Sequence, residues 1–150
     1  MGVDPGVRGG VVVLAANGAV KFCRGLSPDE ETTEGVLRDA CTELWNYGGF
    51  ECFLEKVGYI RGDGGQGAFT FGNVNGFIRG FLRASRVTIY AVPPQLWQAK
   101  LECLTGGDKN VSKARAQSLF PEVKVAHAIA DALLIAQYGR QTLFGGRGGT

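Results

Sequence analysis

The sequence lacks the features that would assign it to several large classes of protein. No apolar run approaches the roughly 18 residues that a membrane-spanning helix requires, so no membrane partner is expected. No internal repeat and no second domain is visible, and 150 residues suffice for a core that needs neither disulfides nor a structural metal. We therefore expect one domain over residues 1–144 and a flexible glycine-rich tail over residues 145–150.

The four cysteines are too scattered to form a zinc or redox motif. Cys23, Cys41, Cys52 and Cys103 include no C-x-x-C pair. Thiols buried in the core are the better interpretation. Unpaired thiols are typical of a reducing compartment, which is where we expect the protein to reside.

The net charge of +2 is small, but the charges are unevenly distributed. Residues 25–55 carry eight acidic groups and one basic group, whereas residues 56–124 carry ten basic groups and four acidic groups. Affinity for phosphates depends on local Lys and Arg rather than on the total charge. A one-sided nucleic-acid surface and an ordinary solvated surface are both compatible with this pattern.

Short apolar runs separated by turn residues predict an α/β fold. Strands are expected over residues 2–5, 10–15, 20–24, 50–57 and 87–92, and the first three form antiparallel hairpins. A first helix is expected from a cap at Ser27 to Gly48. Further helices are expected at about residues 68–84, 95–104, 112–120 and 126–138. This order predicts a mixed five-stranded sheet flanked by helices.

Four residues of types that bind divalent metals stand where two-metal hydrolysis of a phosphodiester needs them: Asp4, Glu55, His127 and Asp131. Asp4 and Glu55 each end a short apolar run, and His127 and Asp131 are four apart, on one face of an expected helix. Carboxylates from separate elements can hold two cations roughly 4 Å apart. Carboxylates suit Mg²⁺, whereas the imidazole would bind Mn²⁺, position water or orient a phosphate. The alternatives are that Asp4 only forms a turn, that Glu55 only ends an exposed strand, and that His127 is a structural histidine.

Basic residues in two regions are candidates for phosphate contacts. Lys109, Lys113 and Arg115 form a cluster that can hold the scissile phosphate, although a solvated helix start explains them too. Arg79, Arg83 and Arg86 recur at helical spacing in the region expected to be a helix at residues 68–84.

Glycines and aromatic residues mark two further candidate surfaces. Gly72, Gly76 and Gly80 recur every four residues, which lets another backbone approach closely, either a second copy of the chain or the protein's own sheet. Before the glycine-rich loop of residues 62–67, Tyr59 can wedge between bases or lie on the surface as an ordinary tyrosine.

Several short motifs, in this order and spacing, resemble those of RuvC-like Holliday junction resolvases. They are Val3-Asp4-Pro5-Gly6, Leu54-Glu55-Lys56-Val57, Phe71-Gly72, residues 93–97, Phe120-Pro121 and the run of residues 127–136. The likeness covers residues 2–139 and is nearest to the monokaryotic-chloroplast type of plants and to related phage and bacterial members.

The resemblance implies an RNase H-like fold and an endonuclease that acts on four-way DNA junctions, with two Mg²⁺ or Mn²⁺ per active site. It implies a homodimer that places one site at each of two opposed strands. A plant member would act in the plastid nucleoid, and other members in the cytoplasm of a bacterial or phage-infected cell. The plastid type also implies a preference for cleavage at paired cytosines.

Carried over position by position, the resemblance makes Asp4, Glu55, His127 and Asp131 the catalytic and metal-binding residues. The expected DNA contacts are Lys56, Tyr59, Arg61, Arg79, Arg83, Lys109, Lys113 and Arg115. The expected dimer interface comprises Gly76, Phe77 and Phe81. The last catalytic pair is four apart, as in the plastid and phage-like branch, rather than three apart as in bacterial RuvC, and this spacing bears on subfamily more than on chemistry.

Two other functions remain open at this point. A YqgF-like RNA-processing nuclease is the main enzymatic alternative. An inactive junction-binding protein is the alternative outside enzymes, although the presence of all four candidate ligands argues against it.

Overall fold

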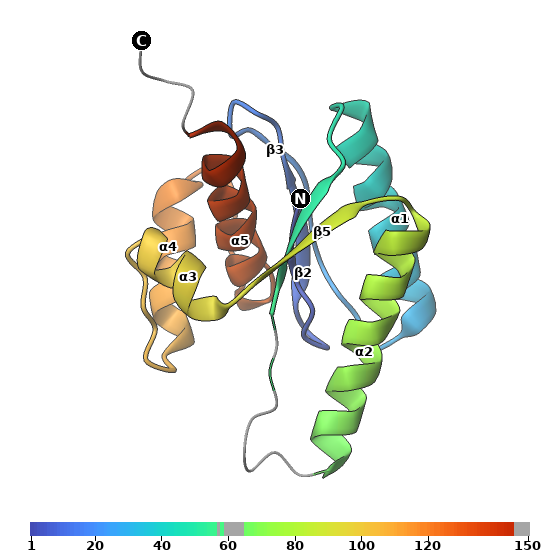
Figure 1. Cartoon of the computed structure of the whole chain (residues 1–150). Coiled ribbons are helices and arrows are strands. Elements are labelled where there is room, and N and C mark those ends of the chain that lie inside the picture. Colours follow the sequence, from blue (N-terminus) through green and yellow to red (C-terminus); the bar gives the residue numbers. More distant parts are fainter. Residues whose placement is uncertain (57, 59–64, 146–150) are drawn as a thin grey trace.

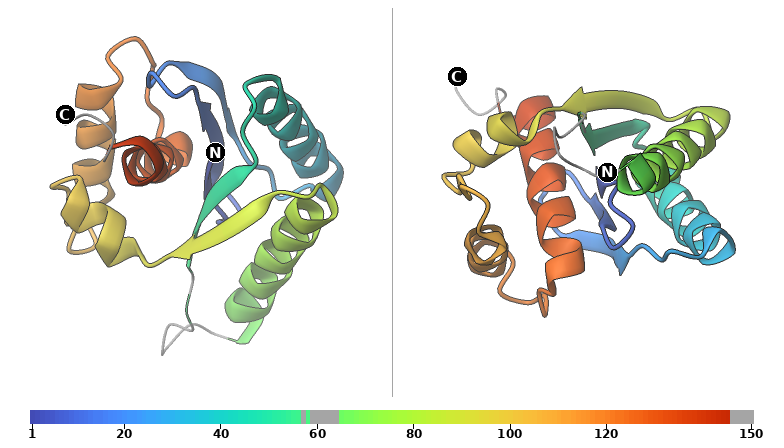
Figure 2. Two further views of the ribbon diagram at one scale, coloured as in Figure 1. Left: turned by 45° about the horizontal axis from the view of Figure 1, so that its top comes forward. Right: turned by 90° about the horizontal axis from the view of Figure 1, so that it is seen from below.

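A central β-sheet separates two layers of helices in the computed structural model, which describes residues 1–56, 58 and 65–145 (Figure 1). Helices α1 (Glu30–Asn46) and α2 (Gly65–Ala84) cover one face of the sheet. Helices α3 (Pro94–Lys100), α4 (Lys109–Leu119) and α5 (His127–Phe144) cover the other face. Figure 2 shows the two layers from further directions, with α5 directly on the sheet. No helix in these described ranges has the length and apolar character to cross a membrane.

The sheet has five strands in the order β3-β2-β1-β4-β5, as the mixed-sheet prediction required. The strands are β1 (Gly2–Asp4), β2 (Gly10–Leu14), β3 (Val20–Gly25), β4 (Glu51–Glu55) and β5 (Thr88–Val92). Strands β1, β2 and β3 pair antiparallel, which confirms the predicted hairpins. Strand β4 is parallel to both of its neighbours, β1 and β5. Val3 pairs with Leu54, so the next residues, Asp4 and Glu55, lie at the same edge of the sheet.

Several predicted helix boundaries are wrong by a few residues. The N-cap of α1 is Asp29, whose Oδ2 accepts a hydrogen bond from the Thr32 amide at 2.7 Å, and the predicted cap Ser27 instead accepts from the Asp29 amide at 3.1 Å. Both α2 and α4 begin three residues before the predicted starts at residues 68 and 112, and α5 continues to Phe144. Arg86 lies beyond the end of α2 with a φ of 57°, so only Arg79 and Arg83 share that helix.

Two glycines allow α5 to lie directly against the sheet. A Cβ at Gly2 would lie 2.6 Å from the Ala132 carbonyl oxygen, and a Cβ at Gly10 would lie 2.5 Å from that of Ala128. Both distances are shorter than carbon and oxygen tolerate, so the backbone of α5 contacts the backbone of β1 and β2. The apolar residues in the middle of α5, including Leu133 and Ile135, are fully buried.

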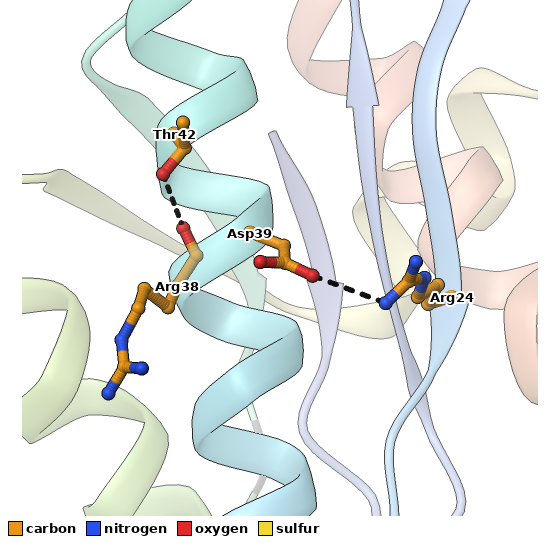
Figure 3. A network of polar contacts seen from close by, with 4 residues as sticks. All are labelled: Arg24, Arg38, Asp39 and Thr42. Carbon is orange, nitrogen blue, oxygen red and sulfur yellow. Dashed lines mark hydrogen bonds and ion pairs between the residues drawn. The ribbon is translucent and has the colours of Figure 1, made fainter.

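Helix α1 carries much of the acidic charge, and an exposed ion pair joins it to the edge strand β3. The Arg24 guanidinium on β3 pairs with Asp39 at 3.2 Å, and the Thr42 hydroxyl donates to the Arg38 carbonyl at 3.0 Å (Figure 3). An exposed pair of this kind contributes little to stability. The four cysteines are free, and all but the half-buried Cys23 are buried, as predicted for core thiols.

Candidate active site

Asp4 lies at the end of β1, where the chain turns sharply. Its Oδ1 accepts a hydrogen bond from the Gly6 amide at 3.0 Å. Burial raises the pKa of the Asp4 carboxyl, and the negative charge of Asp131 raises this pKa further. The Gly6 hydrogen bond and the Lys109 ammonium act in the opposite direction. Asp4 is therefore held in place in an environment that resists its negative charge.

Glu55 lies at the end of β4, beside β1. Burial, followed by the charges of Asp4 and Asp131, raises the pKa of Glu55 to about 7. A hydrogen bond of 3.2 Å from Trp97 Nε1 to Glu55 Oε1 lowers this pKa, as does Lys109. The pKa of Glu55 thus depends on the carboxylates of two other elements as well as on its own burial.

The first turns of α5 supply the remaining two predicted ligands. His127 is the first residue of the helix and is exposed, whereas Asp131 is one turn further along. The Oδ1 atom of Asp131 is buried and has no hydrogen-bond partner among the residues that the structure describes. A buried carboxylate oxygen without a partner is costly, so this atom is a natural ligand for a cation.

A cavity of about 320 Å³ opens between β1, α4 and α5. Its lining consists of Asp4, Arg8, Lys109, Ser112, His127, Ala128 and Asp131. Three of the four predicted ligands therefore share one cavity, and Glu55 is coupled to it through the charges of Asp4 and Asp131. Within residues 1–56, 58 and 65–145, no three His, Cys, Asp or Glu side chains are close enough to bind one metal ion in this conformation.

The chemistry of the site nevertheless fits a divalent cation. Carboxylate oxygens are the ligands that Mg²⁺ prefers. The repulsion that raises the pKa values of Asp4 and Glu55 would be relieved by a positive charge among them, and the unpartnered Asp131 oxygen would gain a ligand. Asp4, Glu55 and Asp131 are therefore the residues that would hold such an ion, and His127 is exposed nearby at the start of α5.

The predicted basic cluster divides into residues at the site and residues away from it. Lys109 lines the cavity, but Lys113 does not. Arg115 donates from Nε to the Leu101 carbonyl at 2.7 Å and lies 3.5 Å from Glu102, so it joins α4 to the end of α3. Its position favours a structural role over a phosphate contact.

Sequence reasoning missed two polar residues of the cavity and the tryptophan that bonds to Glu55. Arg8 lies in the β1–β2 loop four residues after Asp4, and its closeness in the chain was the signal that could have found it. Ser112 is buried in the wall of the cavity. Trp97 had been noted only as part of a motif, and its bond to Glu55 spans 42 positions of the chain.

Helix α2 presents its glycines outward. A Cβ at Gly72, Gly76 or Gly80 would meet nothing within 4 Å, so the alternative that this stripe packs on the protein's own sheet is wrong. Phe77 and Phe81, the other predicted interface residues, are half-buried and pack partly against the core under α2.

The remaining predicted DNA contacts lie near this helix or outside the described residues. Arg83 and Lys56 are exposed, and Arg79 is half-exposed. Tyr59, Arg61 and residues 62–64 of the glycine-rich loop fall outside the described residues, as does nearly all of the predicted tail, whereas residues 65–67 of that loop form the start of α2.

Comparison with known proteins rests on structure alone. No protein-family model and no curated protein matches this sequence. The structure of Thermus thermophilus RuvC in complex with a Holliday junction substrate aligns with a TM-score of 0.67 and 19% identity, over 96% of this chain and 94% of that one. A second Thermus thermophilus RuvC structure aligns with a TM-score of 0.59 and 22% identity, over 96% and 95% of the two chains.

The chain has the RuvC fold. This finding confirms the predicted RNase H-like architecture. The RuvC fold accounts for nearly the full length of both proteins, which leaves little of this chain for additional structure.

Proposed function

We propose that this protein is a divalent-metal-dependent endonuclease that resolves four-way DNA junctions. The observation that carries the proposal is that Asp4 and Glu55 follow paired residues of β1 and β4, that Asp4 and Asp131 line one cavity, and that the charges of Asp4 and Asp131 raise the pKa of Glu55. Further support comes from the RuvC fold, since one protein with this fold has been solved with a Holliday junction substrate.

The residues divide between holding cations and handling the substrate. Two ions, Mg²⁺ or Mn²⁺, would supply Lewis-acid activation of the scissile phosphodiester when bound. Asp4, Glu55 and Asp131 provide the oxygen ligands. His127, exposed at the start of α5, serves as a fourth ligand or orients water or phosphate from the rim.

Positive charge around the cavity suits a phosphate backbone. Lys109 and Arg8 line the cavity together with the carboxylates, and they offset the negative charge that a phosphate brings. Outside the cavity, Arg79 and Arg83 on α2 and Lys56 after β4 supply further basic side chains that are exposed or half-exposed. Contacts of this kind position DNA without reading its sequence.

Symmetric resolution requires two sites, so we further propose that the chain acts as a homodimer through α2. The open stripe of Gly72, Gly76 and Gly80 offers close approach to a second helix, and the exposed parts of Phe77 and Phe81 offer apolar area. A two-fold axis through this helix would direct one active site at each of two opposed strands.

Within the RuvC-like proteins, we place this chain with the plastid and phage-like branch. The support is the spacing of four between His127 and Asp131. A preference for cutting at paired cytosines follows from that placement and is part of the proposal.

One assay tests the central proposal against its alternatives. Labelled four-way junction, duplex DNA, single-stranded DNA and RNA are each incubated with the protein, with and without Mg²⁺ or Mn²⁺. We expect metal-dependent paired cuts in the junction and little cleavage of the other substrates. Preferential cleavage of RNA would favour the RNA-processing nuclease, and junction binding without any cleavage would favour the inactive binding protein.

A further inference from the structure

Among the described residues, the bond from Trp97 to Glu55 is the only hydrogen bond between two side chains that involves any of the four predicted ligands, since the bond that Asp4 accepts comes from the Gly6 backbone. The indole Nε1 lies 3.2 Å from Glu55 Oε1, and the Trp97 side chain is fully buried. An indole N–H donates but never accepts, so this contact has one possible direction. It also keeps its direction whether Glu55 is charged or neutral.

Each end of this contact is anchored by a different part of the fold. Glu55 pairs with Val92 on β5, and the Lys56 amide donates to the Val92 carbonyl at 2.7 Å. The chain then passes through Pro93 and Pro94, which restrict the backbone where α3 begins. Trp97 follows one turn later.

The indole of Trp97 is itself held by the core on the α5 side of the sheet. Trp97 belongs to the same buried cluster as Leu101 of the α3 end and Leu133 of α5. Helix α5 also carries Asp131. Trp97 therefore ties the carboxylate of β4 to the layer that carries the carboxylate of α5.

We propose that Trp97 is the positioning residue for Glu55. It engages Oε1 through the indole N–H, so Oε2 remains available to a cation. Without this hydrogen bond, the Glu55 side chain would be free to rotate, and the N–H of Trp97 would lack an acceptor inside the core. This role rests on the proposed function, since it matters for a cation only if Glu55 binds one.

The chain offers a matched control because it contains two tryptophans. Trp45 lies in the last turn of α1 and is 44% exposed, and α1 covers the face of the sheet opposite to that of α3 and α5. Trp97→Phe keeps an aromatic ring but removes the N–H donor. Trp45→Phe makes the same chemical change away from the site.

The first measurement is calorimetric titration of each variant with Mn²⁺ alone, in the absence of DNA. Loss of an outer partner of a metal ligand commonly weakens metal binding by about 10–100-fold. We expect Trp97→Phe to fall in that range and Trp45→Phe to bind as the wild type does. Circular dichroism at the titration temperature verifies that both variants are folded.

The second measurement reads the contact directly and needs no metal. In the Trp45→Phe background, Trp97 is the sole indole fluorophore. We expect Glu55→Ala to shift its emission, because the N–H loses its acceptor, and Glu55→Gln to restore the emission, because the amide oxygen still accepts. Emission that is unchanged by Glu55→Ala overturns the proposal.

A double-mutant cycle separates positioning from general damage to the core. If Trp97 acts through Glu55, then Trp97→Phe weakens Mn²⁺ binding by less than about twofold once Glu55 is already Gln. A full loss in that background, or normal binding by Trp97→Phe alone, refutes the role of Trp97. Failure of the wild type to bind Mn²⁺ or to cut junctions would instead refute the proposed function, and the fluorescence result would still stand.

Discussion

Gly9 packs directly on Asp4, so that a Cβ at Gly9 would lie 2.9 Å from the carboxyl carbon of Asp4. Gly9→Ala would therefore displace Asp4 or the loop that carries it. We expect junction cleavage to fall by more than about 10-fold, because small misplacements of a reacting constellation are expensive. Gly35→Ala is the control, since a Cβ at Gly35 meets nothing within 4 Å. That variant should retain its cleavage rate and gain up to about 1 kcal/mol in free energy of unfolding.

Removal of any one of the three carboxylates should separate cutting from binding. We expect Asp4→Asn, Glu55→Gln and Asp131→Asn each to reduce cleavage by more than about 100-fold, since even an outer partner of a metal ligand is worth roughly 10–100-fold. Junction affinity, measured by gel shift in Ca²⁺ or chelator, should remain close to that of the wild type because Lys and Arg hold the phosphates. Parallel loss of binding and cutting would contradict the assignment.

His127 should behave differently from the carboxylates because it is exposed at the start of α5. We expect His127→Ala to bind junctions normally and to cut them more slowly than the wild type. Comparison of the cleavage rates in Mg²⁺ and in Mn²⁺ then distinguishes its roles. If His127 is a ligand that prefers Mn²⁺, the variant should lose more activity with Mn²⁺ than with Mg²⁺. A variant with full activity in both ions would make His127 a structural residue.

Salt dependence of binding should identify the phosphate contacts. A single replacement by Ala at Arg79, Arg83, Lys109 or Lys113 should make the plot of log binding constant against log salt concentration shallower, by about 1 in slope. Arg115→Ala is the informative comparison, because this side chain is engaged with Leu101 and Glu102. It should lower the melting temperature and leave the slope unchanged, and a shallower slope would restore Arg115 to the DNA contacts.

Gly76→Leu tests the dimer on a chain that should fold normally, because a Cβ at Gly76 meets nothing within 4 Å. We expect the variant to sediment as a monomer and to convert paired cuts in a cruciform plasmid into isolated nicks. Gly35→Leu places the same side chain on α1, where a Cβ also meets open space, and should remain dimeric. A wild-type chain that stays monomeric even on a junction would refute the dimer proposal.

The raised pKa of Glu55 has a consequence for stability. Because its pKa is about 7 in the native state against an ordinary value of 4.5, the native chain holds a proton that the unfolded chain has released between these values. Stability of the metal-free protein should therefore fall as pH rises from about 4.5 to about 7 and should change little from this source above pH 7.

Differential scanning calorimetry in chelator checks the sign of this effect. Glu55→Gln should remove most of the decline between pH 4.5 and pH 7, and a Mn²⁺ excess should reverse it in the wild type by favouring the charged carboxylates. Identical pH profiles for the wild type and Glu55→Gln would show that Glu55 titrates normally.

The sequence predicted the sheet and the places of the candidate ligands in it because both depend on local patterns. Short apolar runs predicted the strands. The carboxylates at the ends of two of these runs, Asp4 and Glu55, were therefore predicted to lie at strand ends, and they do. The helical spacing of His127 and Asp131 predicted that they share a face, and both line the same cavity.

Contacts between distant segments were beyond sequence reasoning. The bond from Trp97 to Glu55 depends on the register of β4 with β5 and on the direction in which α3 leaves the sheet. The diversion of Arg115 to the Leu101 carbonyl likewise depends on how α3 and α4 meet. Charge and spacing alone made Arg115 look equivalent to Lys109, although only Lys109 lines the cavity.

The direct contact of α5 with the sheet at Gly2 and Gly10 fixes the distance between β1 and α5 at the site. Main-chain atoms, rather than side chains that change rotamer, set the separation between the strand that ends in Asp4 and the helix that carries Asp131. Conservative substitutions elsewhere in the core, such as Leu133→Met, can therefore alter stability without altering the spacing of the carboxylates. The distance between Asp4 and Asp131 therefore depends on these two glycines more than on the choice of apolar side chains around them.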